Sequence, residues 1–297
     1  MEQPNSPFFH YNSMIDCLAI ICRHAVPNLL PSKEYLTNFL GAKIDTKVYP
    51  PLLAGREGQI EPIPIPANWH ADISEWAAAF RAVELSGSRF SMIELGCGWG
   101  CWMINTGCAA RRMGKESRLT GIEGDQEHIA MAKSALAANG FNPEQYRVVH
   151  GIAASESGFA LFPVADDASV QWGSEPIIGA SAEFMSRAVA SGKFIQLPLV
   201  GLRDAAGGVE RVDLLHIDIQ GGEYAFLNSS ISSLNEIVAY VLVGTHSRQI
   251  EGRIFDLMLS NGWRLEIERP ALCQLNEHGP HVTVDGVQAW RNMRLLP

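Results

Sequence analysis

A short apolar stretch, residues 90–95, runs directly into three glycines that alternate with other residues, Gly96, Gly98 and Gly100. Glycine has no Cβ, so it adopts positive φ angles and lets the backbone approach a bound molecule closely. In open α/β sheets, ligands lie beyond the carboxyl ends of the strands, at turns of this kind between a strand and a helix. The turn therefore predicts a Rossmann-like α/β fold with a ligand site at that edge of the sheet.

The spacing of these glycines separates two classes of ligand. Turns that bind dinucleotides read G-x-G-x-x-G, whereas this turn reads G-x-G-x-G, and Glu94 stands two residues before its first glycine. A second carboxylate, Glu123, ends the next apolar stretch, where it is placed to accept hydrogen bonds from ribose hydroxyls. Glu94 is placed to hold an amino group, so the pair predicts S-adenosylmethionine as the cofactor. A nicotinamide dinucleotide is the alternative, because ribose-binding carboxylates serve both cofactors.

Apolar stretches alternate with helical patterns along most of the chain. The run at 237–244 is continuously apolar and that at 212–219 is mainly apolar, which is typical of parallel strands buried on both faces. Further strands are expected at 118–123, 146–154 and 194–200, and antiparallel strands at 264–269, 281–284 and 286–292. The repeated β-α-β order predicts a mostly parallel seven-stranded sheet with an antiparallel C-terminal strand.

The first part of the chain has a different pattern. Helical stretches at 14–25 and 32–40 are followed by a proline-rich segment, and its alternating prolines at 62, 64 and 66 exclude a helix. We expect residues 1–68 to form an N-terminal extension with helical segments and an extended strap, and residues 69–297 to form the main domain.

Charge and composition exclude several classes of partner. The net charge of −9 argues against a nucleic-acid-binding surface, which needs clustered Lys and Arg. The sequence shows no secretory signal, and no apolar run reaches the ~18 residues that a membrane helix needs. Six cysteines without a CxxC pair are typical of reduced thiols. We expect a cytoplasmic protein that binds neither nucleic acid nor membrane; its oligomeric state is left open, a homo-oligomer included.

The glycine turn and the two carboxylates resemble the corresponding motifs of class I methyltransferases. That resemblance implies their Rossmann-like fold and S-adenosylmethionine as the cofactor. It places Ala153, in the turn after the third strand, near the adenine. The other expected cofactor-binding residues lie in or next to the two turns: Glu94, Gly96, Cys97, Gly98, Glu123 and Gly124.

Later segments resemble the FkbM family of methyltransferases. The counterparts of the family's motifs are Gly201–Asp204, His216–Glu223 and Val243–His246, and they occur in the family's order. The family usually has a basic residue where His216 stands and Glu where Gln220 stands, so the roles of these two positions do not carry over. The resemblance implies methylation of a hydroxyl on a small molecule, a sugar or a natural product.

Three polar residues, His216, Asp218 and Gln220, alternate along a predicted strand that is otherwise apolar. A central parallel strand normally has no place for polar side chains. Burying a carboxylate without a partner is costly, so Asp218 needs a hydrogen-bond partner, a ligand or a metal. Its position near the carboxyl end of the strand makes it a candidate for the cofactor site as well as for catalysis.

Two further residues complete the set of catalytic candidates. Glu223 follows two glycines and either caps the next helix or faces the substrate. His246 ends the next strand, and the ordinary pKa of histidine suits a general base that accepts a hydroxyl proton. Either His246 or Asp218 is expected to take that proton. The same two side chains could instead hold a divalent cation, although no ligand spacing requires a metal.

These features together predict direct transfer of a methyl group to a substrate oxygen. The N-terminal strap with Trp69 and His70 is a candidate cover over the site, and simple packing is the alternative role for Trp69. Two alternatives are a NAD-dependent oxidoreductase and a catalytically inactive protein that keeps the methyltransferase fold as a binding module. The inactive protein would have no affinity for the cofactor, so a binding measurement separates it from an enzyme.

Overall fold

An eight-stranded sheet forms the centre of the protein. The computed structural model describes residues 6–154, 157–277 and 279–297. The strands lie in the order β1 (Asn12–Ser13), β12 (Trp263–Arg269), β15 (Gly286–Asn292), β11 (Tyr240–Thr245), β10 (Leu214–Ile217), β4 (Arg89–Leu95), β5 (Glu116–Glu123) and β6 (Tyr146–His150). The five from β11 to β6 are parallel, and β15 runs antiparallel to both of its neighbours. The predicted Rossmann-like sheet with an antiparallel C-terminal strand is confirmed, and β1 extends it by one short strand.

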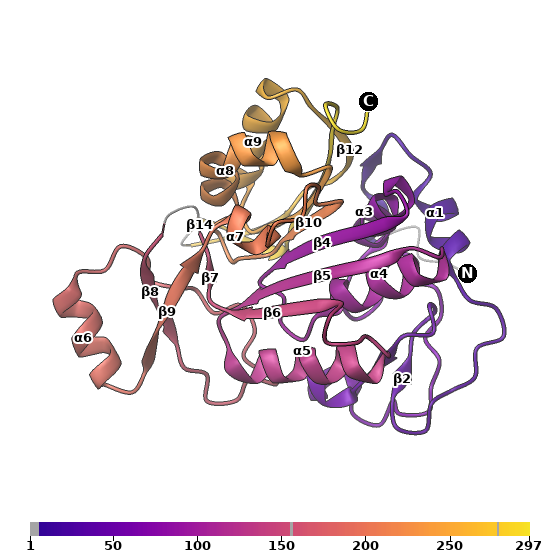
Figure 1. Ribbon diagram of the computed structural model, residues 1–297, viewed down its shortest axis with the longest axis horizontal. Coiled ribbons are helices and arrows are strands. Elements are labelled where there is room, and N and C mark those ends of the chain that lie inside the picture. Colours follow the sequence, from indigo (N-terminus) through magenta and orange to yellow (C-terminus); the bar gives the residue numbers. More distant parts are fainter. Residues whose placement is uncertain (1–5, 155–156, 278) are drawn as a thin grey trace.

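Helices cover both faces of this sheet (Figure 1). One apolar core contains side chains of α3 (Ile73–Leu85), α4 (Cys101–Arg112) and α5 (Gln126–Ala138). The other contains side chains of α7 (Leu202–Ala206), α8 (Glu223–Ile237) and α9 (Arg248–Ser260). Strand β4 contributes Phe90 and Met92 to the first core and Ile93 and Leu95 to the second. None of the helices in the described part of the chain is long and apolar enough to cross a membrane.

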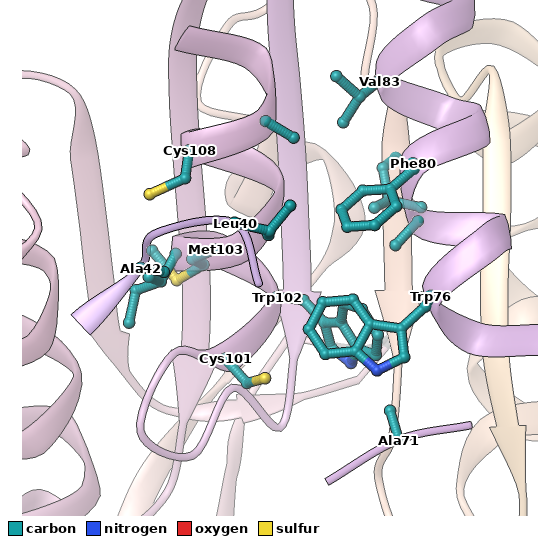
Figure 2. Close-up of a cluster of buried hydrophobic side chains, with 14 of the residues drawn as sticks. Leu40, Ala42, Ala71, Trp76, Phe80, Val83, Cys101, Trp102, Met103 and Cys108 are labelled. Carbon is teal, nitrogen blue, oxygen red and sulfur yellow. The ribbon is translucent and has the colours of Figure 1, made fainter. Parts of the chain in front are cut away.

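Aromatic side chains join α3 to α4 in the first core. Figure 2 shows Trp76 of α3 beside Trp102 of α4, and their ring centroids are 4.9 Å apart in an edge-on arrangement. Leu40 and Ala42 of the N-terminal extension lie in the same cluster. The extension therefore shares the core of the main domain, and this packing fixes the segment that precedes α3 beside the glycine turn.

The extension contains little regular structure. Besides β1, which joins the main sheet, its elements among the described residues are a 3₁₀ turn (Pro7–Phe9), α1 (Cys17–His24), β2 (Leu36–Thr37), β3 (Lys43–Ile44), a second 3₁₀ turn (Thr46–Val48) and α2 (Pro50–Leu53). The predicted helix at 32–40 is wrong, because β2 and β3 form a small hairpin there. The Asn38 side chain accepts hydrogen bonds from the backbone N–H groups of Leu40 and Ala42, and Gly41 has a φ of +81°. Such side-chain bonds favour a turn over a helix.

A small second sheet stands beside the carboxyl ends of the parallel strands, and with α6 (Ala182–Ala190) it projects at the left of Figure 1. It consists of β7 (Ile152–Ala153), β9 (Phe194–Val200) and β8 (Phe159–Pro163). The stretch predicted as one strand at 146–154 is split at Gly151, where an added Cβ would lie 2.7 Å from the Val200 side chain. The turn at Gly151 brings Ala153 out of the main sheet and toward the ligand edge.

The C-terminal strands differ from the prediction at one place. Strands β12 and β15 pair in the main sheet as expected, but β14 (Gly279–Val284) pairs only with β13 (Leu272–Asn276) among the described residues. Since β15 already lies between β11 and β12, it leaves no edge there for β14. The prediction that residues 281–284 close the main sheet is therefore wrong; they form a separate hairpin.

A buried ion pair connects the start of α3 to β12. The Asp72 carboxylate accepts hydrogen bonds from the backbone N–H groups of Ser74 and Glu75, so it caps α3. Its other oxygen accepts from the Arg269 guanidinium, and both side chains are almost completely buried. Arg269 also donates to the carbonyl of Asp285, at 2.6 Å.

Substitution of Asp72 by alanine should lower the free energy of unfolding by about 3–5 kcal/mol, because it leaves the buried Arg269 without its partner. Urea unfolding followed by circular dichroism measures the change. Asp16→Ala is the matched control, since Asp16 caps the more exposed helix α1 and its loss should cost only about 1 kcal/mol. Equal losses in the two variants would contradict a special role for the ion pair.

Candidate functional site

Two adjoining cavities lie at the carboxyl ends of β4, β5 and β10. The first encloses about 410 Å³ and the second about 310 Å³. Four residues line both cavities: Gly96, Gly98, Trp172 and Asp218. The strand order reverses between β4 and β10, and this is where open α/β sheets bind their ligands.

The glycine turn is held close to the neighbouring strand ends. The backbone N–H groups of Gly96 and Cys97 both donate to the carbonyl of Ile122, at 3.0 Å. Gly96 has a φ of +72°, and a Cβ added there would lie 2.1 Å from the carbonyl oxygen of Asp218. Only glycine fits this position, so the turn can pass directly over the end of β10.

Glu123 fixes the other side of the turn. One carboxylate oxygen accepts from the backbone N–H of Gly98 at 2.8 Å, and the other from the backbone N–H of Asp125 at 2.8 Å. Glu123 is almost buried, yet it lines the first cavity. Each carboxylate oxygen offers about two acceptor positions, so both oxygens retain capacity for ligand hydroxyls.

The far wall of the first cavity contains aromatic side chains that sequence analysis did not identify. The imidazole of His128 stacks on the indole of Trp172, with ring centroids 4.0 Å apart and planes inclined by 7°. Burial opposes protonation of His128, but Glu123, 3.7 Å away, raises the pKa of the imidazole. A Cβ added to Gly124 would lie 2.5 Å from the Phe162 ring. These contacts join segments distant in sequence, and no local motif marks them.

Glu94 lies in the second cavity, and it does not line the first. Its two oxygens accept from the backbone N–H groups of Trp102 and Met103, at 3.2 and 3.0 Å, at the start of α4. Burial raises the pKa of Glu94 to about 8, although these two hydrogen bonds oppose the shift. A neighbouring positive charge would favour its ionised form.

Two neutral histidines line the second cavity, His70 from the N-terminal side and His216 from β10. Burial lowers the pKa of His70 to about 4, and burial together with His70 lowers the pKa of His216 to about 3. Within the described part of the chain, Nε2 of His70 and Nδ1 of His216 have no hydrogen-bond partner. An unpaired buried polar atom costs about 1–3 kcal/mol, so both nitrogens are suited to a ligand.

Asp218 lies where the two cavities meet. It follows the last residue of β10, and its side chain is 48% exposed because it faces both cavities. Desolvation of the carboxylate inside the site raises the pKa of Asp218 to about 6; the charge of His246 opposes this shift and that of Glu223 adds to it. Gln220, which sequence alternation places on the same strand, instead lies in the following turn with a φ of +52°.

His246 and Glu223 lie next to Asp218, and neither lines the first or the second cavity. Nδ1 of His246 is 2.8 Å from Glu223, and Nε2 is 3.3 Å from Asp218. Burial would lower the pKa of His246, but the hydrogen bond to Glu223 and the charge of Asp218 raise it to about 9. Glu223 is fully buried and also accepts from the backbone N–H of Gly221. At neutral pH, His246 therefore carries a proton and is poorly suited to accept one.

The structure thus places all eight residues predicted to bind the cofactor in the lining of these two adjoining cavities. Six of them line the first cavity: Gly96, Gly98, Glu123, Gly124, Ala153 and Asp218. Glu94 and Cys97 line the second. Over residues 6–154, 157–277 and 279–297, no group of three or more His, Cys, Asp or Glu side chains is arranged to hold a metal ion.

One relative establishes the family. A protein of Jannaschia sp. (strain CCS1), described as a "putative methyltransferase", is 43% identical over 261 residues, which are 88% of this chain and 93% of that protein. No family model matches the chain.

Solved structures show weaker likenesses. The methyltransferase FkbM of Methylobacillus flagellatus KT aligns with a TM-score of 0.46 and 11% identity, over 73% of this chain and 54% of that one. An O-methyltransferase of Bacillus cereus, in complex with SAH, aligns with a TM-score of 0.36 and 11% identity, over 72% of this chain and 78% of that one. Likenesses of this size carry no argument about activity.

The ion pairs of His246 predict a dependence of stability on pH. A group whose pKa is raised by folding stabilises the protein below its unfolded pKa, near 6.5, and loses that contribution as the pH rises through about 9. The difference in unfolding free energy between wild type and His246→Gln should therefore shrink by up to about 3 kcal/mol from pH 6 to pH 10. Urea unfolding at several pH values measures it.

The exposed His10 provides the control, and His10→Gln should follow the wild-type profile across this range. A constant difference between wild type and His246→Gln from pH 6 to pH 10 would show that His246 is not held in its protonated form.

Proposed function

The chain belongs to the same methyltransferase family as the Jannaschia protein, and we propose that it is an S-adenosylmethionine-dependent enzyme that methylates a hydroxyl group of a small molecule, a sugar or a natural product. One observation carries the proposal: the glycine turn and the Glu123 carboxylate meet at two adjoining cavities that contain every residue predicted to hold the cofactor.

The residues present fit this cofactor. Glu123 retains acceptor positions for the ribose hydroxyls, and the small residues Gly124 and Ala153 line the first cavity together with Phe162, where the adenine would lie. Gly96 and Gly98 line both cavities without a side chain, and a Cβ at either position would also collide with Asp218 or Trp172. The first cavity, at about 410 Å³, lies within the range of about 300–1,000 Å³ found for small-molecule sites. When bound, S-adenosylmethionine supplies an activated methyl group on its sulfonium.

Asp218 is the group that this arrangement places for catalysis. It faces the junction of the two cavities, and its raised pKa of about 6 leaves it mostly ionised at neutral pH. A carboxylate with a pKa close to the working pH is suited to accept a hydroxyl proton. In the proposed reaction Asp218 binds the acceptor hydroxyl at the junction of the two cavities and takes its proton, and this contact aligns the acceptor.

His246 and Glu223 then act through Asp218. The protonated imidazole of His246 holds the Asp218 carboxylate in place and keeps it ionised, and the buried Glu223 holds the imidazole in turn. Sequence reasoning offered His246 or Asp218 as the base. The geometry favours Asp218, because His246 lines neither cavity and already carries a proton at neutral pH.

We further propose that the acceptor is neither a nucleic acid nor a membrane lipid and that the protein works in the cytoplasm. The net charge of −9 is unfavourable to phosphate-rich partners. All six cysteines are free thiols, which is the usual state in a reducing compartment. A dinucleotide-dependent oxidoreductase is the competing function, and it predicts binding of NAD.

S-adenosylhomocysteine should bind the purified protein, and Glu123→Ala should weaken that binding by about 10-fold or more, because it removes a carboxylate acceptor from the ribose. Isothermal titration calorimetry measures both affinities. Glu127→Ala removes an exposed carboxylate on α5 and should leave the affinity unchanged. Binding of NAD without binding of S-adenosylhomocysteine would favour the oxidoreductase, and binding of neither would favour an inactive protein.

Asp218→Asn should lower turnover by about 100-fold or more, the range for a general base. Turnover is measured as release of S-adenosylhomocysteine, with an acceptor selected from a panel of hydroxyl, amine and thiol compounds. Asp285→Asn is the control, since Asp285 approaches the same histidine at 3.9 Å but lines neither cavity; its turnover should stay within about 5-fold, because only a rim charge is lost. Methylation of amines or thiols alone would overturn O-methylation.

A further inference from the structure

We propose that His70 and His216, which line the second cavity, hold the carboxylate of the cofactor's amino-acid part. Glu94, already expected from the sequence to hold the amino group, lines the same cavity. The inference depends on the proposed function, since it assigns a place to one part of S-adenosylmethionine. It adds two residues, His70 and His216, to the site as groups that position the cofactor.

The position of the second cavity supports this assignment. Glu123 lines the first cavity and is bonded to the backbone N–H of Gly98, and Gly98 lines both cavities. A nucleoside whose ribose hydroxyls bind Glu123 therefore has its 5′ substituent at the turn. Gly96 also lines both cavities, and Glu94 lines the second, so the 5′ substituent would lie toward Glu94.

The charges in the second cavity match an amino acid. An amino acid carries an ammonium and a carboxylate on adjoining carbons, so its site needs one acidic and one basic partner. Glu94 is the acidic partner, and an ammonium beside it would favour its ionised form. The lining of the cavity contains no Lys or Arg within the described part of the chain. His70 and His216 are therefore the side chains there that can become cationic.

Each of the two histidines has a buried ring nitrogen that is available to an anionic ligand. Nε2 of His70 and Nδ1 of His216 lack a partner among the residues described, although Nδ1 of His216 lies 4.0 Å from Glu94. Both rings are neutral because they are buried, as their lowered pKa values show. A carboxylate placed against them would give the nitrogens an acceptor and would raise both pKa values. Glu94 and Asp218 are the other ionisable groups that line the cavity apart from Tyr49 and the thiols of Cys97 and Cys101.

Three ligands test this assignment on the unmodified protein by isothermal titration calorimetry. S-adenosylhomocysteine carries the whole amino acid, its decarboxylated analogue keeps only the amino group, and 5′-methylthioadenosine lacks both groups. We expect S-adenosylhomocysteine to bind about 10-fold or more tightly than the decarboxylated analogue, because charge-assisted hydrogen bonds are lost with the carboxylate. Equal affinities for these two ligands would overturn the assignment and would leave the second cavity for the methyl acceptor.

Two variants then identify the partners of the carboxylate. His70→Phe and His216→Phe keep an aromatic ring and remove the ring nitrogens. Each should reduce the advantage of S-adenosylhomocysteine over the decarboxylated analogue to about 3-fold or less, as expected when a charged partner is missing. Each should also bind 5′-methylthioadenosine as wild type does, which shows that the variant is folded. His24→Phe is the matched control, since His24 is buried and stacks on Phe80 outside the two cavities.

The outcomes separate the two proposals. If wild type binds neither S-adenosylhomocysteine nor 5′-methylthioadenosine, the proposed function itself is wrong. Normal binding of both, with the full carboxylate advantage retained in His70→Phe and in His216→Phe, would overturn only the role of the histidines. If a variant does not fold, the comparison of ligands on wild type still decides whether a carboxylate partner exists.

Discussion

The close approach of the glycine turn to the end of β10 is the constraint from which the rest of the site follows. Gly96 passes so near the carbonyl of Asp218 that a side chain there would collide with it. Because the turn lies this close to β10, the backbone N–H of Gly98 reaches the Glu123 carboxylate on one side. On the other side, the Asp218 side chain lines both cavities. A side chain at Gly96 would push the turn away from β10 and so separate Glu123 from the proposed base, Asp218.

Sequence analysis predicted those parts of the site whose residues belong to short motifs along the chain. Gly96 and Gly98 precede a helix, and Glu123 ends an apolar strand. Because these features are visible among neighbours in the chain, sequence analysis placed all three residues at the ligand site. The stacked pair of His128 and Trp172 depends on a contact between distant segments, for which no periodicity exists. Predictions failed for the same reason at 32–40, where Asn38 forms a turn, and at 281–284, where a hairpin replaces a strand of the main sheet.

The protonation state of a side chain is harder to predict from the sequence than its position in the fold. A histidine at the end of a strand has an ordinary pKa that suits a general base, and from sequence that role was reasonable for His246. In the folded chain Glu223 and Asp218 both contact the imidazole, and they raise its pKa to about 9. His70 and His216 show the opposite case, since burial without an acidic partner at hydrogen-bond distance keeps them neutral. Histidine therefore occurs here in two states: His246 is protonated beside two carboxylates, whereas His70 and His216 are buried and neutral.

The N-terminal extension links ligand binding to folding. It supplies Tyr49 to the second cavity, whose wall continues through Trp69 and His70, and the chain just after them is fixed by the buried pair of Asp72 and Arg269. A ligand that contacts this wall binds only when the segment is docked, so it stabilises the docked state by RT ln(1 + [L]/Kd). Arg269 also holds the backbone at Asp285, beside His246. One buried arginine thus connects the wall of the second cavity to the group that positions Asp218, so loss of this ion pair should weaken ligand binding and disturb the proposed base together.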